Sequence, residues 1–217
     1  MDELRAFLAP GLKRLAPDGK LSNEPADAGT LAETSHLVVF DLEMSGSNAA
    51  VHEVLEVGAI RVGLEAGWPE RSSVGTKVRP KRIGNAEPGA IKVVGYNSKS
   101  WREAIELRAA FDQVTAIAAG DVLAGWGIGQ DIAFLVEVCR QLGMPWPFAS
   151  VAIDIQPIAR QILRNTGQVD RFNLGHVADR LGIGRMGEHS ALADAYATYD
   201  VLLKLFEQRP GAGVTPS

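Results

Sequence analysis

The sequence has little cysteine and no long apolar run, and these absences exclude several classes of protein. Cys139 is the only cysteine among 217 residues, so the chain cannot form an internal disulfide. This favours a reduced, cytoplasmic setting. The first residues, MDELRAFLAPGLKRLAP, lack the basic-then-apolar order of a signal peptide. No run reaches the ~18 apolar residues that a membrane-spanning helix needs, so we expect no membrane association.

The sequence also lacks a dominant charge. It has 22 Lys and Arg residues against 26 Asp and Glu residues, a formal net charge of −4. This balance argues against a protein that coats duplex nucleic acid by charge alone. It is compatible with a small acidic substrate, or with one strand end held through a metal ion.

The chain is long enough for one domain with an appendage. Of its residues, 46% are hydrophobic, which suits a single core of about 150–200 residues. We expect an N-terminal extension over residues 1–35, made of an amphipathic helix at 2–15 and a linker at 16–35. A compact domain follows over 36–208, and 209–217 form a flexible tail.

The apolar runs and turn residues of this domain predict a strand meander followed by alternating strands and helices. The predicted strands are Leu37–Leu42, Val54–Val62, Ser73–Val78, Asp121–Gly125 and Val151–Asp154. The predicted helices include Ile132–Leu142, Pro157–Leu163 and Leu192–Gln208. This order indicates an α/β fold with a mixed five-stranded sheet and helices on both faces.

Two carboxylates end the first of these strands, in the stretch VVFDLEMSG. Residues i and i+2 of a strand point to the same face, so Asp41 and Glu43 lie side by side. Partly burying two like charges costs several kcal/mol unless something compensates. An arginine, a shared proton or a metal ion would each do so.

Two further aspartates lie in suggestive places. Asp131 follows a predicted strand and a glycine-rich loop, at the start of a helix. An aspartate favoured there by the helix dipole is the simpler interpretation. Asp194 lies among alanines in the last helix, in the stretch ALADAYA. Small neighbours indicate close packing on the sheet, where a charge needs a reason.

A histidine precedes the last helix. His189 comes five residues before Asp194, a spacing that would separate the two side chains on a continuous helix. His189 can therefore face the same site only from the loop or first turn before the helix. Histidine is the natural proton acceptor near neutral pH. The alternative is a surface-loop histidine.

Taken together, these five residues describe one site. Carboxylate oxygens without cysteine ligands suit Mg²⁺ or Mn²⁺. Two such ions about 3.5–4 Å apart can hold a phosphodiester in line for attack by water. Metal ions are therefore our preferred explanation for the paired carboxylates.

The three motifs, in this order, resemble those of the DEDDh 3′–5′ exonucleases (DnaQ-like), which have a ribonuclease H-like fold. The first motif matches Asp41-Leu42-Glu43, the second matches Asp131, and the third, His-x4-Asp, matches His189 and Asp194. The stretches VLEVGAIRV, KVRP and RFNLGHVADRLGI are also similar to family segments. DLEMSG and IGQD look like oligoribonuclease, whereas the third motif looks like the polymerase-associated members.

The resemblance implies a role for each residue. Asp41, Glu43 and Asp194 would hold the metal ion that activates water. Asp41 would bridge to a second ion, with Asp131 helping directly or through water. His189 would take the proton from the attacking water, and nucleoside 5′-monophosphates would leave from the 3′ end.

Two side chains are interpreted as substrate contacts. By resemblance, Met44 would lie beside the terminal sugar and base, although it could simply fill apolar space. Trp126 could stack on a base or pack in the core. A basic cluster could contact phosphates or form a solvated edge. This cluster consists of Lys77, Arg79, Lys81 and Arg82.

The sequence therefore predicts a metal-dependent 3′–5′ exonuclease. Its expected partners are 3′ ends of single-stranded DNA or RNA, or short oligonucleotides, and a homodimer is kept as an alternative. Two other functions remain open: a nucleic-acid-binding module without catalysis, and a polymerase-bound proofreading subunit.

Overall fold

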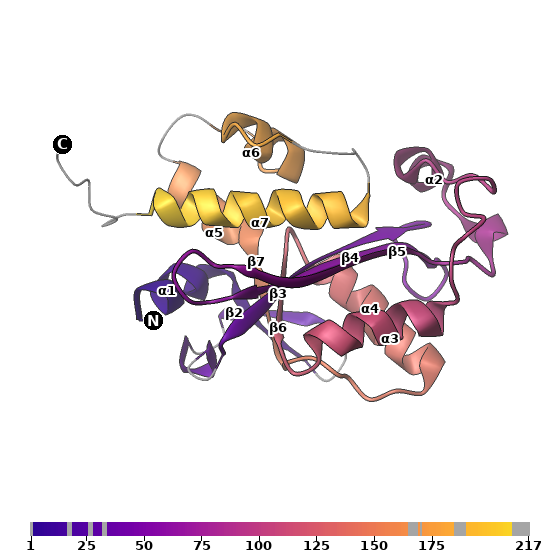
Figure 1. The fold of residues 1–217 in the computed structure, drawn as a ribbon, viewed down its shortest axis with the longest axis horizontal. Helices are drawn as coiled ribbons and strands as arrows, with labels where there is room; N and C mark the ends of the chain where they lie inside the picture. The colour runs from indigo at the N-terminus through magenta and orange to yellow at the C-terminus, as the bar shows by residue number, and fades with distance from the viewer. Residues whose placement is uncertain are drawn as a thin grey trace.

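The computed structural model of the protein describes residues 2–16, 19–25, 28–31, 34–164, 169, 171–184 and 190–209. Within this part the chain forms one mixed seven-stranded sheet with helices on both faces (Figure 1). The strands are β1 (Leu12–Leu15), β2 (Leu21–Pro25), β3 (His36–Met44), β4 (Val54–Gly63), β5 (Glu70–Lys77), β6 (Val122–Gly125) and β7 (Val151–Asp154). The α-helices are α1 (Asp2–Leu8), α2 (Pro88–Val94), α3 (Leu107–Ala118), α4 (Gly129–Leu142), α5 (Ile155–Leu163), α6 (Leu174–Arg180) and α7 (Ala191–Glu207).

The strand order across the sheet is β2-β1-β7-β6-β3-β4-β5. β3, β4 and β5 form the predicted antiparallel meander. β6 and β7 join as parallel strands beside β3, and the connections to them run through α3 and α4. Parallel neighbours need such crossovers, because a short turn can only reverse the chain. None of the helices in the described part is long and apolar enough to cross a membrane.

The prediction of five strands is wrong by two, because the N-terminal segment adds β1 and β2 to the sheet edge. The predicted helix over 2–15 ends at Leu8, and a 3₁₀ turn containing Pro10 leads into β1. β1 pairs antiparallel with β7, with Leu12 opposite Ile153. β2 lies within the stretch interpreted as a linker. The division of the chain at residue 35 stays a prediction.

The N-terminal helix is also packed against the domain. The ring of Phe7 on α1 meets that of Phe206 on α7 edge-on, with centroids 5.0 Å apart. Phe7 and Leu8 are both buried. Edge-to-face aromatic pairs add about 0.5–1.5 kcal/mol to the area they bury. The described first residues thus belong to the core, whereas the predicted tail beyond Arg209 lies outside the described residues.

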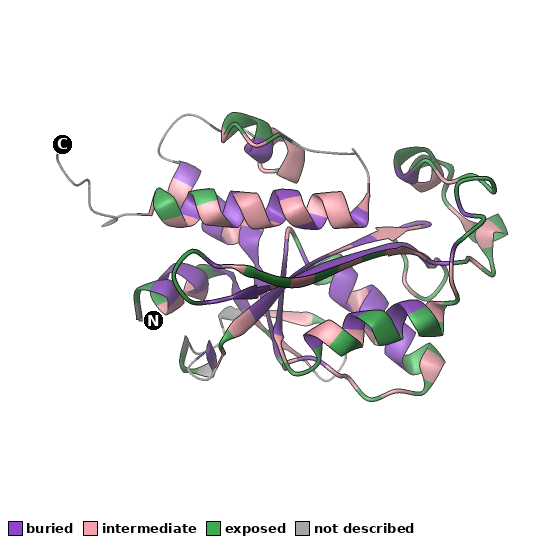
Figure 2. Ribbon diagram, in the orientation of Figure 1, coloured by how far each residue is buried: buried purple, intermediate pink, exposed green. Residues whose placement is uncertain are grey.

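Two layers of helices enclose the sheet. α5, α6 and α7 cover one face, and α3 and α4 cover the other (Figure 1). Both faces of the central strands are buried, and the outer faces of the helices are exposed (Figure 2). Alternation along β3 divides its side chains between these layers. Leu37 and Val39 face α7, whereas Val38, Phe40 and Leu42 face α3 and α4.

Candidate active site

The α7 face of the sheet changes from apolar to acidic toward the end of β3. On this face Leu37 and Val39 are core residues. The next two positions are Asp41 and Glu43, which the register places opposite Gly58 and Glu56 of β4. The strand therefore carries its carboxylates just beyond the core, as its alternation predicts.

Two glycines, which have no side chain, allow α7 to approach this part of the sheet closely. A Cβ atom on Gly58 would lie 2.2 Å from the carbonyl carbon of Ala191, a distance that real Cβ atoms do not reach. Gly75 stands opposite Gly58 on β5, and a Cβ there would lie 2.7 Å from Cδ2 of Leu192. The first turn of α7 consequently rests almost on the strand backbone.

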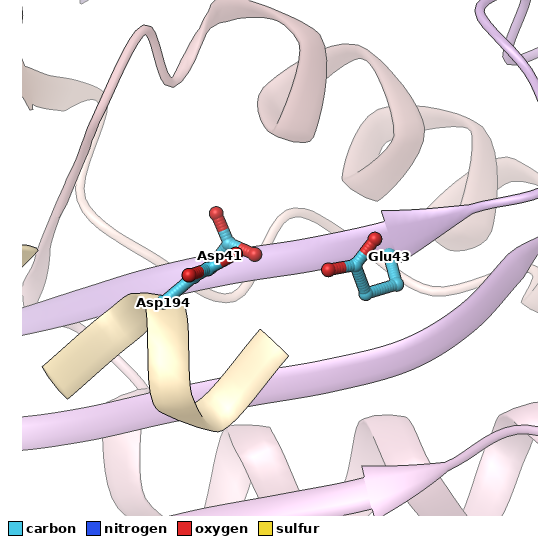
Figure 3. A group of neighbouring side chains, drawn as sticks. All are labelled: Asp41, Glu43 and Asp194. Carbon is cyan, nitrogen blue, oxygen red and sulfur yellow. The ribbon is translucent and has the colours of Figure 1, made fainter. Parts of the chain in front are cut away.

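This close approach brings Asp194 to the strand carboxylates. Carboxylate oxygens of Asp41, Glu43 and Asp194 all lie within 4.8 Å of one another. In Figure 3, Asp194 projects from the start of α7 toward Asp41, and Glu43 lies beside them on the same strand. Three oxygen donors this close form a donor set that fits a hard divalent cation such as Mg²⁺ or Mn²⁺.

Asp131 approaches the same region from the edge of β3. β6 pairs with β3 only as far as Val39, so the last residues of β3 extend past their parallel neighbour. Asp131 lies in the first turn of α4 and is buried. Its Oδ1 accepts a hydrogen bond of 3.0 Å from the backbone N–H of Leu42. The aspartate thus takes the place of a strand partner and is held next to Asp41.

The clustering of acids perturbs the titration of Asp41 most strongly. Burial raises the pKa of its carboxyl well above the usual range. The carboxylates of Asp131, Asp194, Glu43 and Glu56, in decreasing order, raise this pKa further. In the absence of a cation, these groups oppose one another's ionisation.

Two neighbours are shifted for the same reasons. Burial, followed by the charges of Asp194 and Glu56, raises the pKa of Glu43 to about 7. Burial also raises the pKa of Asp131 to about 7, although backbone donors that include Leu42 act in the opposite direction. Ordinary carboxyls in proteins titrate near 4, so these two groups are protonated far more readily near neutral pH than an ordinary carboxyl.

The remaining predicted residues are placed less fully. His189 lies outside the described residues. Met44 is half-buried and packs on the core cluster under α3 and α4. Trp126 packs against the cluster under α7, and its indole N–H is buried with no hydrogen-bond partner in the described structure. The substrate contacts assigned to Met44 and Trp126 stay predictions.

Three of the four side chains of the basic cluster lie near acidic residues. Arg79 and Lys81 both lie 3.3 Å from carboxylate oxygens of Glu106. Arg82 lies 3.8 Å from Glu53. Exposed pairs of this kind contribute about 0–1 kcal/mol. These pairs are compatible with a solvated edge, and the choice between that and a phosphate contact stays a prediction.

Sequence reasoning did not single out two residues that shape this site. Glu56 is buried beside Glu43, and Gly58 admits α7. Both lie on the α7 face of β4, two residues apart, in the largely apolar stretch VLEVGAIRV. A glycine in a strand interior often marks a close backbone approach, and this is the signal that could have identified it.

Comparisons with known proteins agree with the fold and the acidic cluster. The sequence model of the Exonuclease family (RNase_T) matches residues 38–202. The chain belongs to this family, the DEDDh, DnaQ-like 3′–5′ exonucleases. Enzymes of this family are hydrolases that use divalent metal ions.

Two relatives are larger than this chain. A proposed bifunctional exonuclease/endonuclease of Mycobacterium tuberculosis is 28% identical over 196 residues, which are 88% of this chain and 29% of the relative. A PolC-type DNA polymerase III of Thermotoga maritima is 22% identical over 193 residues, 88% of this chain and 13% of the relative. The chain therefore spans less than a third of each.

Two solved structures share the fold. Escherichia coli exonuclease I in complex with a dT13 oligonucleotide superposes with a TM-score of 0.68 at 20% identity. The match covers 81% of this chain and 42% of exonuclease I. The nuclease domain of 3′hExo bound to rAMP gives a TM-score of 0.61 at 19% identity, over 81% of this chain and 94% of that domain.

Proposed function

We propose that the protein hydrolyses phosphodiester bonds at the 3′ end of single-stranded nucleic acid or short oligonucleotides, and releases nucleoside 5′-monophosphates. The observation that carries this proposal is the convergence of Asp41, Glu43 and Asp194, with oxygens within 4.8 Å, from two segments distant in the chain. A binding module without catalysis has no need to hold these carboxylates together at the cost of their mutual repulsion.

The donor set fits a pair of divalent cations. Asp41, Glu43 and Asp194 would hold one Mg²⁺ or Mn²⁺ ion, and Asp41 and Asp131 would hold the second. When bound, the ions supply positive charge that polarises the phosphodiester and lowers the pKa of water. The raised pKa values of Asp41, Glu43 and Asp131 are the physical reason to expect cations there, since a cation favours the ionised form.

The residues of the chain then have separate tasks. His189 accepts a proton from the attacking water, whose oxygen forms a bond to phosphorus. The bond between phosphorus and the 3′ oxygen of the preceding nucleotide breaks, and that oxygen takes up a proton from solvent water to become the new 3′ hydroxyl. The phosphate stays on the 5′ carbon of the released nucleotide. Met44, next to Glu43, would contact the terminal sugar and base.

End-labelled strands test this proposal. Purified protein is incubated with a single strand labelled at either the 5′ or the 3′ end, with Mg²⁺, Mn²⁺ or EDTA. We expect a ladder of shortened strands from the 5′ label and immediate release of a labelled mononucleotide from the 3′ label, both abolished by EDTA. Cleavage of a circular single strand, or no cleavage at any metal concentration or pH, would contradict the proposal.

The substrate class follows from a rate comparison. A related fold binds a DNA strand in one solved structure and rAMP in another, so both nucleic acids are tested. Rates are measured on matched DNA, RNA and dinucleotide substrates of one sequence. A preference of at least tenfold, about 1.4 kcal/mol in transition-state binding, identifies the substrate.

A proofreading role is a second candidate, because the chain matches a 13% portion of a PolC-type polymerase. It predicts faster removal of a mismatched 3′ nucleotide than of a paired one from a primer on a template. Equal rates on the two primers would exclude selection of mismatches by this chain alone.

A further inference from the structure

A carboxylate outside the family motifs lies beside the three that converge. Glu56 of β4 is only 7% exposed. The register places it directly opposite Glu43, so both side chains project to the α7 face. Like charges directly opposite each other on neighbouring strands are destabilising. The position therefore carries a cost that an ordinary polar or apolar side chain would avoid.

The nearest cation in the sheet does not offset this cost. Lys77 stands opposite Glu56 on the other side of β4. Its ammonium lies 4.2 Å from the centroid of the Trp101 ring and donates to the carbonyl of Ser100 at 3.3 Å. No ion pair with Glu56 occurs in the part of the chain that the structure describes. Within the described residues, Glu56 is therefore not explained as half of a salt bridge.

The side chain of Glu56 instead binds the start of α7. The hydroxyl of Ser190 donates to Oε1 of Glu56 at 2.7 Å. Ser190 is the N-cap residue of α7, where a serine oxygen usually accepts from a backbone N–H of the first turn. Here the side chain makes no capping bond. The helix thus forgoes a cap that contributes about 1 kcal/mol, and its serine is used for a contact with the sheet.

That contact fixes the turn on which Asp194 lies. The backbone carbonyl of Ser190 accepts from the N–H of Asp194 at 2.9 Å. Ala191, the next residue, is in contact with Gly58. Asp194 carries the same charge as the carboxylates of Asp41 and Glu43, so repulsion among the three acts against the close approach of the first turn to the sheet. A hydrogen bond to a buried carboxylate counteracts that repulsion, since bonds to charged groups are among the stronger ones.

We infer that Glu56 is a positioning residue for the reaction: through Ser190 it holds the first turn of α7 over β3 and β4 and thereby keeps Asp194 against Asp41 and Glu43. The inference rests on the proposed function. Glu56 touches neither substrate nor attacking water in this account. It acts by holding Asp194 in place. Ser190, which it binds, is also the residue next to His189 in the sequence.

Four variants test the inference: Glu56→Ala, Glu56→Gln, Ser190→Ala and the double variant Glu56→Ala/Ser190→Ala. We expect Glu56→Ala and Ser190→Ala each to lower kcat about 10–100-fold, the cost of misplacing a reacting group by about 1 Å. KM for the oligonucleotide should change less than threefold. The double variant should be no slower than the slower single variant, since both remove one contact.

Glu56→Gln separates the hydrogen bond from the charge. The amide keeps an oxygen that accepts from Ser190 but carries no charge, so we expect at least a third of the wild-type kcat. Tyr196→Phe is the matched control. Tyr196 also ties α7 to the sheet, through a 3.0 Å bond to Glu70, but lies a turn beyond the first. This variant should retain kcat within twofold.

A second readout does not depend on cleavage. Thermal melting with increasing Mn²⁺ reports how well the carboxylates are assembled, and circular dichroism confirms that each variant is folded. We expect the Mn²⁺ concentration that gives half of the maximal increase in melting temperature (the Mn²⁺ midpoint) to rise several-fold in Glu56→Ala and in Ser190→Ala, but not in Tyr196→Phe.

The outcomes are distinguishable. If wild-type protein cleaves and both Glu56→Ala and Ser190→Ala match it, the inference is wrong and the proposed function stands. A large loss in Glu56→Gln with full activity in Ser190→Ala would assign Glu56 a role through its charge and overturn the inference. If wild-type protein cleaves no strand, the proposed function fails, and an unchanged Mn²⁺ midpoint in Glu56→Ala then overturns the positioning role as well.

Discussion

Gly58 of β4 and Ala191 of α7 are in direct backbone contact, so that no side chain fits between them. A Cβ atom at Gly58 would lie 2.3 Å from the Ala191 oxygen and from the Leu192 nitrogen. Since these are backbone atoms, Gly58→Ala must displace the first turn of α7. We expect the free energy of unfolding to fall by about 1–3 kcal/mol and kcat to fall about 10²-fold, measured by urea unfolding and by single-turnover cleavage.

Two other glycines provide graded controls. At Gly75 the closest atom is the end of the Leu192 side chain, which can move, so Gly75→Ala should have a smaller effect. At Gly84 nothing lies within 4 Å, and Gly84→Ala should be neutral or slightly stabilising. Equal effects at all three positions would show that close approach of the helix is not what Gly58 provides.

Asp41→Ala removes the carboxylate that is common to both proposed metal positions. We expect cleavage to fall at least about 10³-fold. The fold should persist, because the substitution also removes one of several crowded negative charges. Cleavage of labelled strands and urea unfolding without metal measure the two effects. Asp112→Ala, which removes an exposed aspartate on α3, is the control; full activity in Asp41→Ala would remove the metal assignment.

His189→Ala tests the proton acceptor. Loss of a general base lowers the rate by about 10²–10⁴-fold, whereas metal binding through the carboxylates should be retained. Single-turnover cleavage measures the rate, and thermal melting with increasing Mn²⁺ measures metal binding. A reduced affinity for Mn²⁺ in His189→Ala would instead identify the histidine as a ligand.

The raised carboxyl pKa values predict how stability without metal depends on pH. Glu43 titrates near 7 in the folded protein but near 4.5 in the unfolded chain, so between these values the folded state binds more protons. Stability must therefore decrease as pH rises from about 4.5 to 7, and level off above 7. For Glu43 alone the loss has an upper bound of about 3 kcal/mol.

Urea unfolding at pH 5, 6, 7 and 8 in EDTA measures this slope. Mn²⁺ should reduce it, because a bound cation favours the ionised carboxylates, and the stabilisation by Mn²⁺ should be largest at pH 8. Glu43→Gln should flatten the slope in EDTA. Stability that is constant or rises over this range in EDTA would contradict the crowding of acids described for this site.

The N-terminal strand offers a test of its place in the core. Leu12 of β1 is 1% exposed and stands opposite Ile153 of β7. Leu12→Ala should reduce the free energy of unfolding by about 2–5 kcal/mol. Arg14 on the same strand is exposed, and Arg14→Ala should change stability by less than about 0.5 kcal/mol. If β1 were only a linker, the two variants would have equal free energies of unfolding.

The sequence predicted the central part of the fold because its strands have strong periodic signals. The alternation along β3 placed Asp41 and Glu43 on one face, and the alanines around Asp194 indicated close packing. These are local patterns with direct structural meaning. The structure brings the three carboxylates within 4.8 Å of one another, whereas their roles and the placement of His189 stay predictions.

The missed features depend on contacts between distant segments. β1 has four residues, follows a turn with Pro10, and gains its stability from pairing with β7, which no local pattern reveals. In the sequence, Glu56 resembles an exposed polar residue that interrupts an apolar strand. Its hydrogen-bond partner, Ser190, comes near the other end of the domain in the sequence. Tertiary pairing decides such positions, and it overrides local propensity.

The long distance in sequence between β3 and α7 has a consequence for synthesis of the chain. Because synthesis runs from the N-terminus, β3, β4 and β5 leave the ribosome long before Asp194 has been translated. Until then Asp41 and Glu43 lack the third carboxylate of their cluster, that of Asp194. The full set of converging carboxylates is consequently assembled only when nearly the whole domain has left the ribosome.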